Sequence, residues 1–215
     1  MIGMGQSRED VLLKCLLNGE ECSPDTIDEF VSALRGGYPL RAVEKLVESP
    51  NRTAHSVGLY IIKELSSHAL PLKELVIDLG KNGYGYDKFI FAEFCIATRL
   101  QDYRLPKIFV KFLNDFDLIL RAKAVMWAIS SNDEDFSKLT ECMDTSSGVQ
   151  KKHKDKLYHV QQERKERAFG IAKEIRQYKL KKDFVCIIES LKERYPREDE
   201  ITFEYLLIYK NKILQ

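Results

Sequence analysis

Apolar residues recur along the chain at intervals of three and four, and almost no segment alternates with a period of two. This spacing is typical of helices with one buried face, whereas a half-buried strand needs strict alternation. Helix boundaries fall between the apolar stripes. Ser7 and Asp10 form a capping-box pattern, and Gly19 closes the stripe that follows. Ser23 followed by Pro24 marks a second helix start. The pattern therefore predicts an all-α chain.

The middle of the chain alternates short and long helical stripes. The same boundary signals predict helices over residues 39–47, 51–65, 71–79, 86–101, 106–113 and 116–130, and a further short helix after Asn132. Leu46, Leu79 and Leu113 occupy the same place before successive turns, at spacings of 33 and 34 residues. One helix pair cannot bury its apolar side alone, but stacked pairs share a core, so this period is typical of an α-solenoid.

One repeat unit is the most regular. The run from Leu105 to Asp115 is a leucine-rich helix that ends in Asn-Asp, and Leu120-Arg121-Ala122-Lys123-Ala124-Val125 follows it. This unit resembles a HEAT repeat, and the resemblance extends over residues 38–143. It implies a HEAT-like α-solenoid of helical hairpins, which binds proteins or sometimes nucleic acid on an extended surface and implies no single reaction. An unrelated helical bundle is the alternative.

The chain changes character after Cys142. Residues 144–148 have linker composition, and residues 151–182 carry 12 Lys and Arg against 4 Asp and Glu on a narrow apolar stripe. We interpret the latter as one long basic helix, followed by helices over 184–195 and 200–214 on either side of Pro196. The predicted domains are thus a HEAT-like repeat region at 1–143 and, at 151–215, the basic helix with two C-terminal helices.

Two predicted helices have almost no polar face. Residues 116–130 and 89–100 are apolar nearly all round, which is typical of helices covered on both sides. We expect the C-terminal helices to fold back over the repeats and make one compact domain, because a large exposed apolar patch is a liability. The alternative is that a partner protein or a second copy covers these helices.

Charge divides unevenly along the chain. The total is 34 Lys and Arg against 33 Asp and Glu, but residues 1–150 hold 17 against 22 and residues 151–215 hold 17 against 11. The basic stretch predicts a basic surface, which either faces solvent, pairs with the acidic repeats, or binds an acidic partner. The residues assigned to this surface are Lys151, Lys152, Lys154, Lys156, Arg164, Lys165 and Arg167.

Candidate chemistry is sparse. The sequence has no GxSxG, P-loop or GxGxxG pattern, and its four histidines and five cysteines have no zinc-ligand spacing. We therefore expect no catalytic residues, no metal, no cofactor and no enzymatic activity. The first ten residues lack an apolar signal region. No apolar run is long enough to cross a membrane. The cysteines show no pattern that indicates disulfide pairing. These absences favour a cytoplasmic protein that does not bind membranes.

The favoured function is a non-enzymatic protein-binding module. A concrete version is a bacterial immunity or antitoxin-type inhibitor, which would bind a toxin such as a nuclease by presenting carboxylates in place of phosphates. The candidate carboxylates are Glu48, Asp78, Asp87, Glu93, Asp102, Asp115, Asp117, Asp133, Glu134 and Asp135. One alternative is a nucleic-acid-binding or DNA-repair protein, since the chain resembles at fold level the HEAT-like DNA alkylation-repair glycosylases. The acidic repeats argue against nucleic-acid binding. The other is a self-associating scaffold, and the sequence fixes neither the partner nor the oligomeric state.

Overall fold

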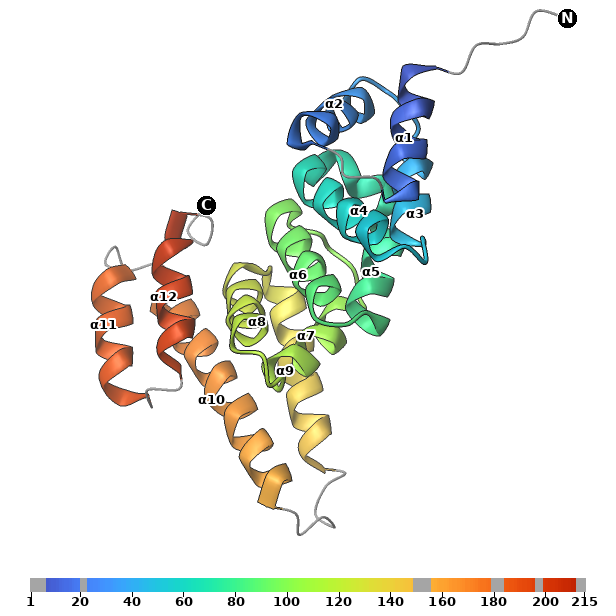
Figure 1. Cartoon of the computed structure of the whole chain (residues 1–215). Helices are drawn as coiled ribbons and strands as arrows, with labels where there is room; N and C mark the ends of the chain where they lie inside the picture. The colour runs from blue at the N-terminus through green and yellow to red at the C-terminus, as the bar shows by residue number, and fades with distance from the viewer. Residues whose placement is uncertain (1–6, 20–22, 149–155, 179–183, 196–198, 212–215) are drawn as a thin grey trace, which may run out of the picture. The chain divides into compact units, whose positions relative to one another are not determined.

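A computed structural model describes residues 7–19, 23–148, 156–178, 184–195 and 199–211, and of residues 144–148 and 156–158 it describes the backbone only. All regular structure in these ranges is helical, which confirms the all-α prediction (Figure 1). In chain order the elements are α1 (Arg8–Asn18), α2 (Pro24–Arg35), α3 (Arg41–Val47), α4 (Arg52–Leu65), the 3-10 helix η1 (Ser66–Leu72), α5 (Lys73–Asn82), α6 (Tyr86–Thr98), α7 (Leu105–Leu113), α8 (Leu118–Ser130), α9 (Asp133–Gly148), α10 (Lys156–Tyr178), α11 (Phe184–Arg194) and α12 (Glu200–Ile208).

The predicted helix starts are confirmed by their capping bonds. The Ser7 hydroxyl accepts from the Asp10 backbone N–H at 3.2 Å, and Gly19 ends α1 in the left-handed conformation. Asn51 caps α4 by accepting from the backbone N–H groups of Thr53 and Ala54. These bonds satisfy backbone donors that have no partner inside the helix, so polar side chains at these positions fix where each helix begins.

The chain divides into two compact units, Met1–Phe94 and Cys95–Gln215. This division differs from the single compact domain that we expected and from the predicted boundary between residues 143 and 151. The C-terminal helices share the second unit with α7, α8 and α9, because α10 and α12 both pack against α8. The apolar surface of α8 therefore ties residues on both sides of the predicted boundary into one core.

Unit 1 is built on close contacts between consecutive helices. α3 packs along α4, and α1 and α2 also contact α4. Gly58 allows the approach of α3 and α4, because a Cβ there would lie 2.8 Å from the Val47 side chain. Gly80 does the same for α5 and α6, because a Cβ there would lie 2.6 Å from the Phe91 ring. Successive helical hairpins thus form, as the short-long alternation predicts, while their stacking as a HEAT-like solenoid stays a prediction.

Unit 2 surrounds α8. Every residue from Leu120 to Ile129 is buried. Trp127 stacks on Phe109 of α7 with ring centroids 4.2 Å apart. α7, α10 and α12 pack on this helix, so for α8 the expected cover by C-terminal helices is confirmed. A helix that is apolar all round is stable only in such a central position.

Two local predictions need correction. η1 lies where no helix was expected, and Ser66 begins it with a positive φ of 50°. α9 continues to Gly148, through the segment predicted as a linker. Serine and threonine cost only a few tenths of a kcal/mol relative to alanine in a helix, which is too little to end a helix that packs against α7. The predicted basic helix is described over Lys156–Tyr178.

None of the helices in the described ranges is long and apolar enough to span a bilayer.

Candidate functional site

The turn between α5 and α6 is an exposed segment of unit 1 whose backbone is held by its own hydrogen bonds. We call its residues, Asn82–Asp87, the turn platform. The backbone N–H of Gly83 donates to the Leu79 carbonyl at 2.9 Å, and the backbone N–H of Asp87 donates to the Tyr84 carbonyl at 2.9 Å. The Asp87 carboxylate in turn accepts from the Tyr84 backbone N–H at 3.1 Å. Its own bonds thus fix the backbone of the platform.

The two glycines of the platform are required by its geometry. A Cβ on Gly83 would lie 2.4 Å from the Leu79 carbonyl oxygen and 2.5 Å from the Asp87 Cβ, so no larger residue fits without moving the backbone. Gly85 has a φ of +45°, a left-handed conformation that other residues adopt at a cost of about 1 kcal/mol or more. The Asn-Gly-Tyr-Gly sequence therefore predicts a turn and also explains its shape.

His55 connects the platform to the neighbouring turn between α3 and α4. Its Nδ1 lies 2.6 Å from the Val47 carbonyl oxygen, and its Nε2 lies 2.8 Å from the Asp87 carboxylate. Both partners are acceptors, so the protonated ring, which is positively charged and donates from each nitrogen, satisfies both contacts. Burial of the ring opposes that charge, but the bonds to Val47 and Asp87 outweigh it and raise the pKa of His55.

This histidine makes the platform pH-dependent. A folded pKa above the unfolded value of about 6.5 means that its stabilising contribution is complete below that pH and is lost as pH rises through the folded pKa. The rate of amide hydrogen exchange at Tyr84 and Asp87 should therefore rise above neutral pH, and this rise should exceed the rise of the intrinsic chemical exchange rate over the same pH range. In His55→Gln this extra acceleration should disappear. An identical pH profile in both proteins would contradict the linkage.

Two tyrosines of the platform face solvent. The side chain of Tyr84 is 85% exposed, the most of any large hydrophobic residue in the described ranges, and that of Tyr86 is 47% exposed. Tyr86 is held by stacking on Phe89, with centroids 5.8 Å apart. Tyrosines on a fixed backbone lose little conformational entropy on contact, so they are favoured in protein interfaces.

Two of the predicted carboxylates are exposed in unit 1. Asp78 is exposed and accepts from the Asn82 side chain at 2.6 Å, at the start of the platform. Glu48 is exposed and directly follows Val47, whose carbonyl is bonded to His55. Unit 1 as a whole holds 10 Lys and Arg against 14 Asp and Glu, a net charge of −4. The sequence predicted both carboxylates as binding residues, whereas it did not single out the exposed tyrosines of the platform.

No family model matches this chain, and comparison with curated proteins and with solved structures finds no significant match either. The arrangement of the side chains is therefore what bears on function.

The remaining predicted carboxylates are divided between the platform, α6 and unit 2. Asp87 belongs to the platform but is committed to His55 and Tyr84. Glu93 is half-buried on α6. The others lie in unit 2, where most have local partners: Asp102 binds Arg104, Asp115 accepts from the Asp117 N–H, Asp117 caps α8, Asp133 binds Arg176, Glu134 binds Lys138 and Asp135 binds Asn132.

Two of these carboxylates are a poor fit for a surface that binds proteins. Asp135 is only 7% exposed because its side chain folds back on Asn132 at the start of α9. The Asp102 carboxylate is 8% exposed and accepts from the Arg104 guanidinium at 2.7 Å.

The three described side chains of the predicted basic surface are wholly or partly buried. Lys165 is 4% exposed and continues the buried stripe of Ala168 and Ile171 on α10. Arg167 lies 3.6 Å from the buried Asp199 carboxylate, and Arg164 lies over the Phe116 ring. Lys151, Lys152 and Lys154 lie outside the described residues, and the Lys156 side chain is not described. Long basic side chains bury their aliphatic stems readily, which charge counting does not reveal.

The described residues contain no group of three or more His, Cys, Asp and Glu side chains placed to hold a metal ion. Cys95 is fully buried, and burial raises the pKa of its thiol well above the usual value.

Proposed function

We propose that this chain is a non-enzymatic protein-binding module and that the turn platform is where it contacts its partner. The observation that carries the proposal is Tyr84, which stands 85% exposed on a backbone fixed by Asp87 and His55. Tyrosine is enriched among the residues that contribute most of the binding energy in protein interfaces. The partner's surface is then expected to offer an apolar pocket at this position.

The charge around the platform favours a basic partner. Glu48 and Asp78 are exposed, and although the exposed Lys81 adjoins the platform, unit 1 as a whole is net acidic. Carboxylates steer a basic protein toward the site and reject acidic ones. A nuclease whose active site is built for phosphates fits this chemistry, so the specific form of the proposal is an immunity or antitoxin-type inhibitor with HEAT-like hairpins. It would act in the cytoplasm, beside the toxin it neutralises.

Nucleic-acid binding is the weaker candidate. It needs Lys and Arg side chains free to contact phosphates along one surface. Of the predicted basic surface, Lys165 is buried and Arg167 faces Asp199. Elsewhere on α10, Arg176 binds backbone carbonyls of unit 2.

Binding measured against the proteins encoded by neighbouring genes tests the proposal. Isothermal titration should find one that binds the full chain, and Tyr84→Ala should weaken that complex about 30-fold or more, the effect of a hot spot. The matched control is Tyr103→Ala. Tyr103 is 75% exposed in unit 2, outside the platform, and its removal should change the affinity less than twofold. Asp78→Asn should mainly slow association and reduce its dependence on salt.

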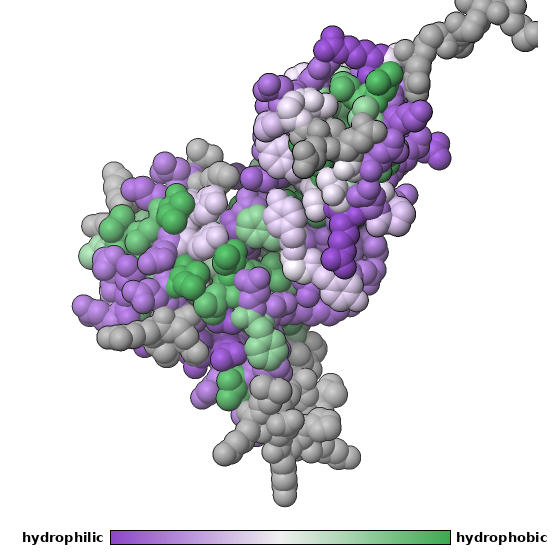
Figure 2. Space-filling model, viewed as in Figure 1, coloured by the Kyte–Doolittle hydropathy of each residue, from purple (hydrophilic) through white to green (hydrophobic). Residues whose placement is uncertain are grey.

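Other outcomes would overturn the proposal. Equal loss in Tyr84→Ala and Tyr103→Ala would place the interface elsewhere. Salt-sensitive binding of duplex DNA, without a protein partner, would favour the nucleic-acid alternative. A stable oligomer in light scattering would favour a self-associating scaffold. Figure 2 shows where that could arise, because hydrophobic side chains gather on the visible face of unit 2. Its exposed apolar residues include Phe116, Ile119, Val160 and Ile208.

A further inference from the structure

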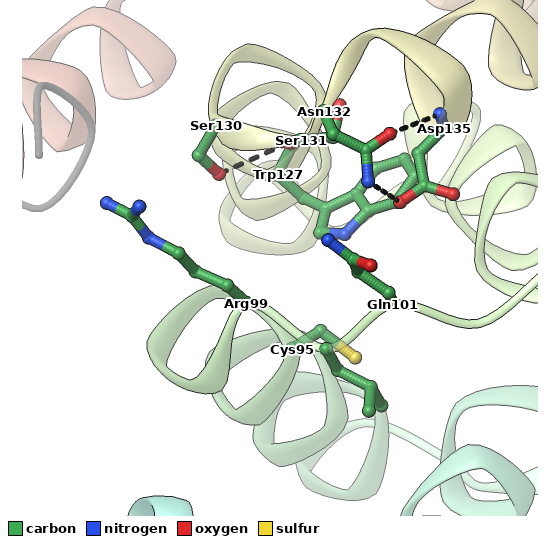
Figure 3. Close-up of a pocket in the computed structure, with 9 residues that line it drawn as sticks. Cys95, Arg99, Gln101, Trp127, Ser130, Ser131, Asn132 and Asp135 are labelled. Atoms are coloured by element: carbon green, nitrogen blue, oxygen red, sulfur yellow. Dashed lines mark hydrogen bonds between the residues drawn. The ribbon is translucent and has the colours of Figure 1, made fainter.

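Unit 2 contains a cavity of about 250 Å³ between the end of α6 and the junction of α8 and α9. Cys95 and Leu100, both buried, belong to its apolar lining. Trp127 lines the cavity from α8, and Gln101 lines it from the loop after α6 (Figure 3). All four residues belong to unit 2, so the cavity does not involve the turn platform.

The indole N–H of Trp127 is a buried polar group that faces this cavity. The residue is only 3% exposed, and Figure 3 shows its ring nitrogen on the edge that is turned toward the Gln101 amide. No residue in the described ranges accepts a hydrogen bond from this nitrogen. An indole N–H is a donor only, and a buried tryptophan usually has an acceptor for it. A molecule that brings an acceptor into the cavity is therefore stabilised at this position.

Gln101 is the second polar side chain with hydrogen bonds to offer a ligand. The hydroxyls of Ser130 and Ser131 donate to backbone carbonyls of α8, and the Asn132 amide donates to Asp135 at 3.0 Å. The Gln101 side chain differs from these, because it is exposed and makes no hydrogen bond with any residue in the described part of the chain. Its amide therefore offers a ligand both an N–H donor and a carbonyl acceptor.

The charged groups of the cavity disfavour a charged ligand. In Figure 3 the Arg99 guanidinium and the second oxygen of Asp135 point away from each other, so they do not form a pair of anchors across one space. Asp135 still lines the cavity and repels an anion. A donor-only cation cannot accept the hydrogen bond that the Trp127 N–H offers. The two groups that are turned toward each other, the Trp127 N–H and the Gln101 amide, are both neutral.

We propose that this cavity binds a small neutral primary carboxamide. The ligand's carbonyl oxygen accepts from the Trp127 N–H, its amide N–H donates to the Gln101 side-chain carbonyl, and its apolar part packs against Cys95 and Leu100. A primary carboxamide carries an acceptor and a donor on one carbon, which matches these two protein groups. The cavity volume lies below the range of roughly 300–1,000 Å³ that holds drug-sized molecules, so the apolar part is limited to a small ring or a short aliphatic chain.

Benzamide is the probe that tests the proposal on the full chain. Calorimetry should find that it binds at millimolar concentration or below. Trp127 is the only tryptophan in the sequence, so the chain gives a single indole N–H signal in a proton–nitrogen correlation spectrum. This signal should move downfield as benzamide is added, because a new acceptor reaches the indole N–H.

Three analogues of nearly the same shape separate the contacts. Acetophenone keeps the carbonyl but has no N–H donor, so it should still move the indole signal and should bind about tenfold more weakly than benzamide. Benzamidinium is a donor-only cation and benzoate is an acceptor-only anion. Each of these two should bind more weakly than benzamide by about tenfold or more, because neither makes both contacts.

Gln101→Met removes the amide and keeps the length of the side chain. The variant should fold, because Gln101 is exposed. It should bind benzamide about tenfold more weakly than the parent, but its affinity for acetophenone should be unchanged, since acetophenone has no N–H to donate to Gln101. Gln177→Met is the matched control, the same substitution at an exposed glutamine of α10 outside the cavity, and it should bind benzamide as the parent does.

Four results would overturn the proposal. Benzamide does not bind at millimolar concentration, or it binds without moving the indole signal. Benzamide and acetophenone bind equally well, which would mean that Gln101 recognises nothing in the ligand. Benzamidinium or benzoate binds more tightly than benzamide, which would indicate a site for a charged ligand.

Discussion

Replacing Trp127 with alanine is expected to lower the free energy of unfolding of unit 2 by about 3–5 kcal/mol. Trp127 is 3% exposed in the C-terminal half of α8, and its ring stacks on Phe109 with centroids 4.2 Å apart. Its removal leaves a void between helices that are fixed by other contacts, so the surrounding structure can collapse only in part. Urea unfolding followed by circular dichroism measures the change, because far-ultraviolet ellipticity does not require the lost tryptophan.

Trp127→Phe is the matched variant. It keeps an aromatic ring against Phe109 and should cost clearly less than alanine. Equal destabilisation by Trp127→Ala and Trp127→Phe would contradict this prediction. It would mean that unit 2 is not stabilised by the stacking and core packing of this side chain. A loss below about 1 kcal/mol for alanine would mean that α8 is not central to the core.

Replacing Arg176 with alanine is expected to cost about 2–3 kcal/mol, although the residue lies on a helix that the sequence suggested to be solvated. Its guanidinium donates to the Ser131 carbonyl at 2.6 Å and to two further carbonyls at the end of α8, and it binds Asp133 at the start of α9. These carbonyls have no partner within α8, so the arginine of α10 caps another helix. Thermal and urea unfolding measure the loss.

The control for this variant is Arg194→Ala. Arg194 also makes an ion pair, with Glu174 at 2.6 Å, but its side chain is 53% exposed. Exposed ion pairs contribute about 0–1 kcal/mol to stability. Comparing the two alanine variants therefore separates the contribution of an ion pair from that of helix capping. Arg176→Lys should recover part of the loss, since an ammonium group reaches fewer carbonyls at once. Equal effects of Arg176→Ala and Arg194→Ala would argue against the capping role.

The sequence predicted local structure better than it predicted the surroundings of charged residues. Capping by Ser7 and Asn51 is local chemistry within a few residues, and both caps are confirmed. The burial of Lys165 was missed because it depends on α8 and α10, which are distant in sequence. Lys123 was missed for the same reason. It is fully buried, with its ammonium 4.1 Å from the centre of the Tyr209 ring beyond α12.

The candidate site was predictable in part. The Asn-Gly-Tyr-Gly sequence indicates a turn at residues 82–85, and Asp78 and Glu48 were already assigned to binding on the basis of charge. The exposure of Tyr84 could not be inferred, because a tyrosine beside an apolar helix is as compatible with a core position. The role of His55 depends on two partners 8 and 32 residues away, and no local pattern reveals such a bridge.

The central position of α8 also has a consequence for biosynthesis. α8 ends at Ser130, but α12, which covers part of it, begins only at Glu200, about 70 residues later. At about 5–20 residues per second, the ribosome needs several seconds to synthesise the intervening chain. During that interval an almost entirely apolar helix has emerged without its final neighbours. The nascent chain is therefore expected to be a chaperone client until its last helices are made.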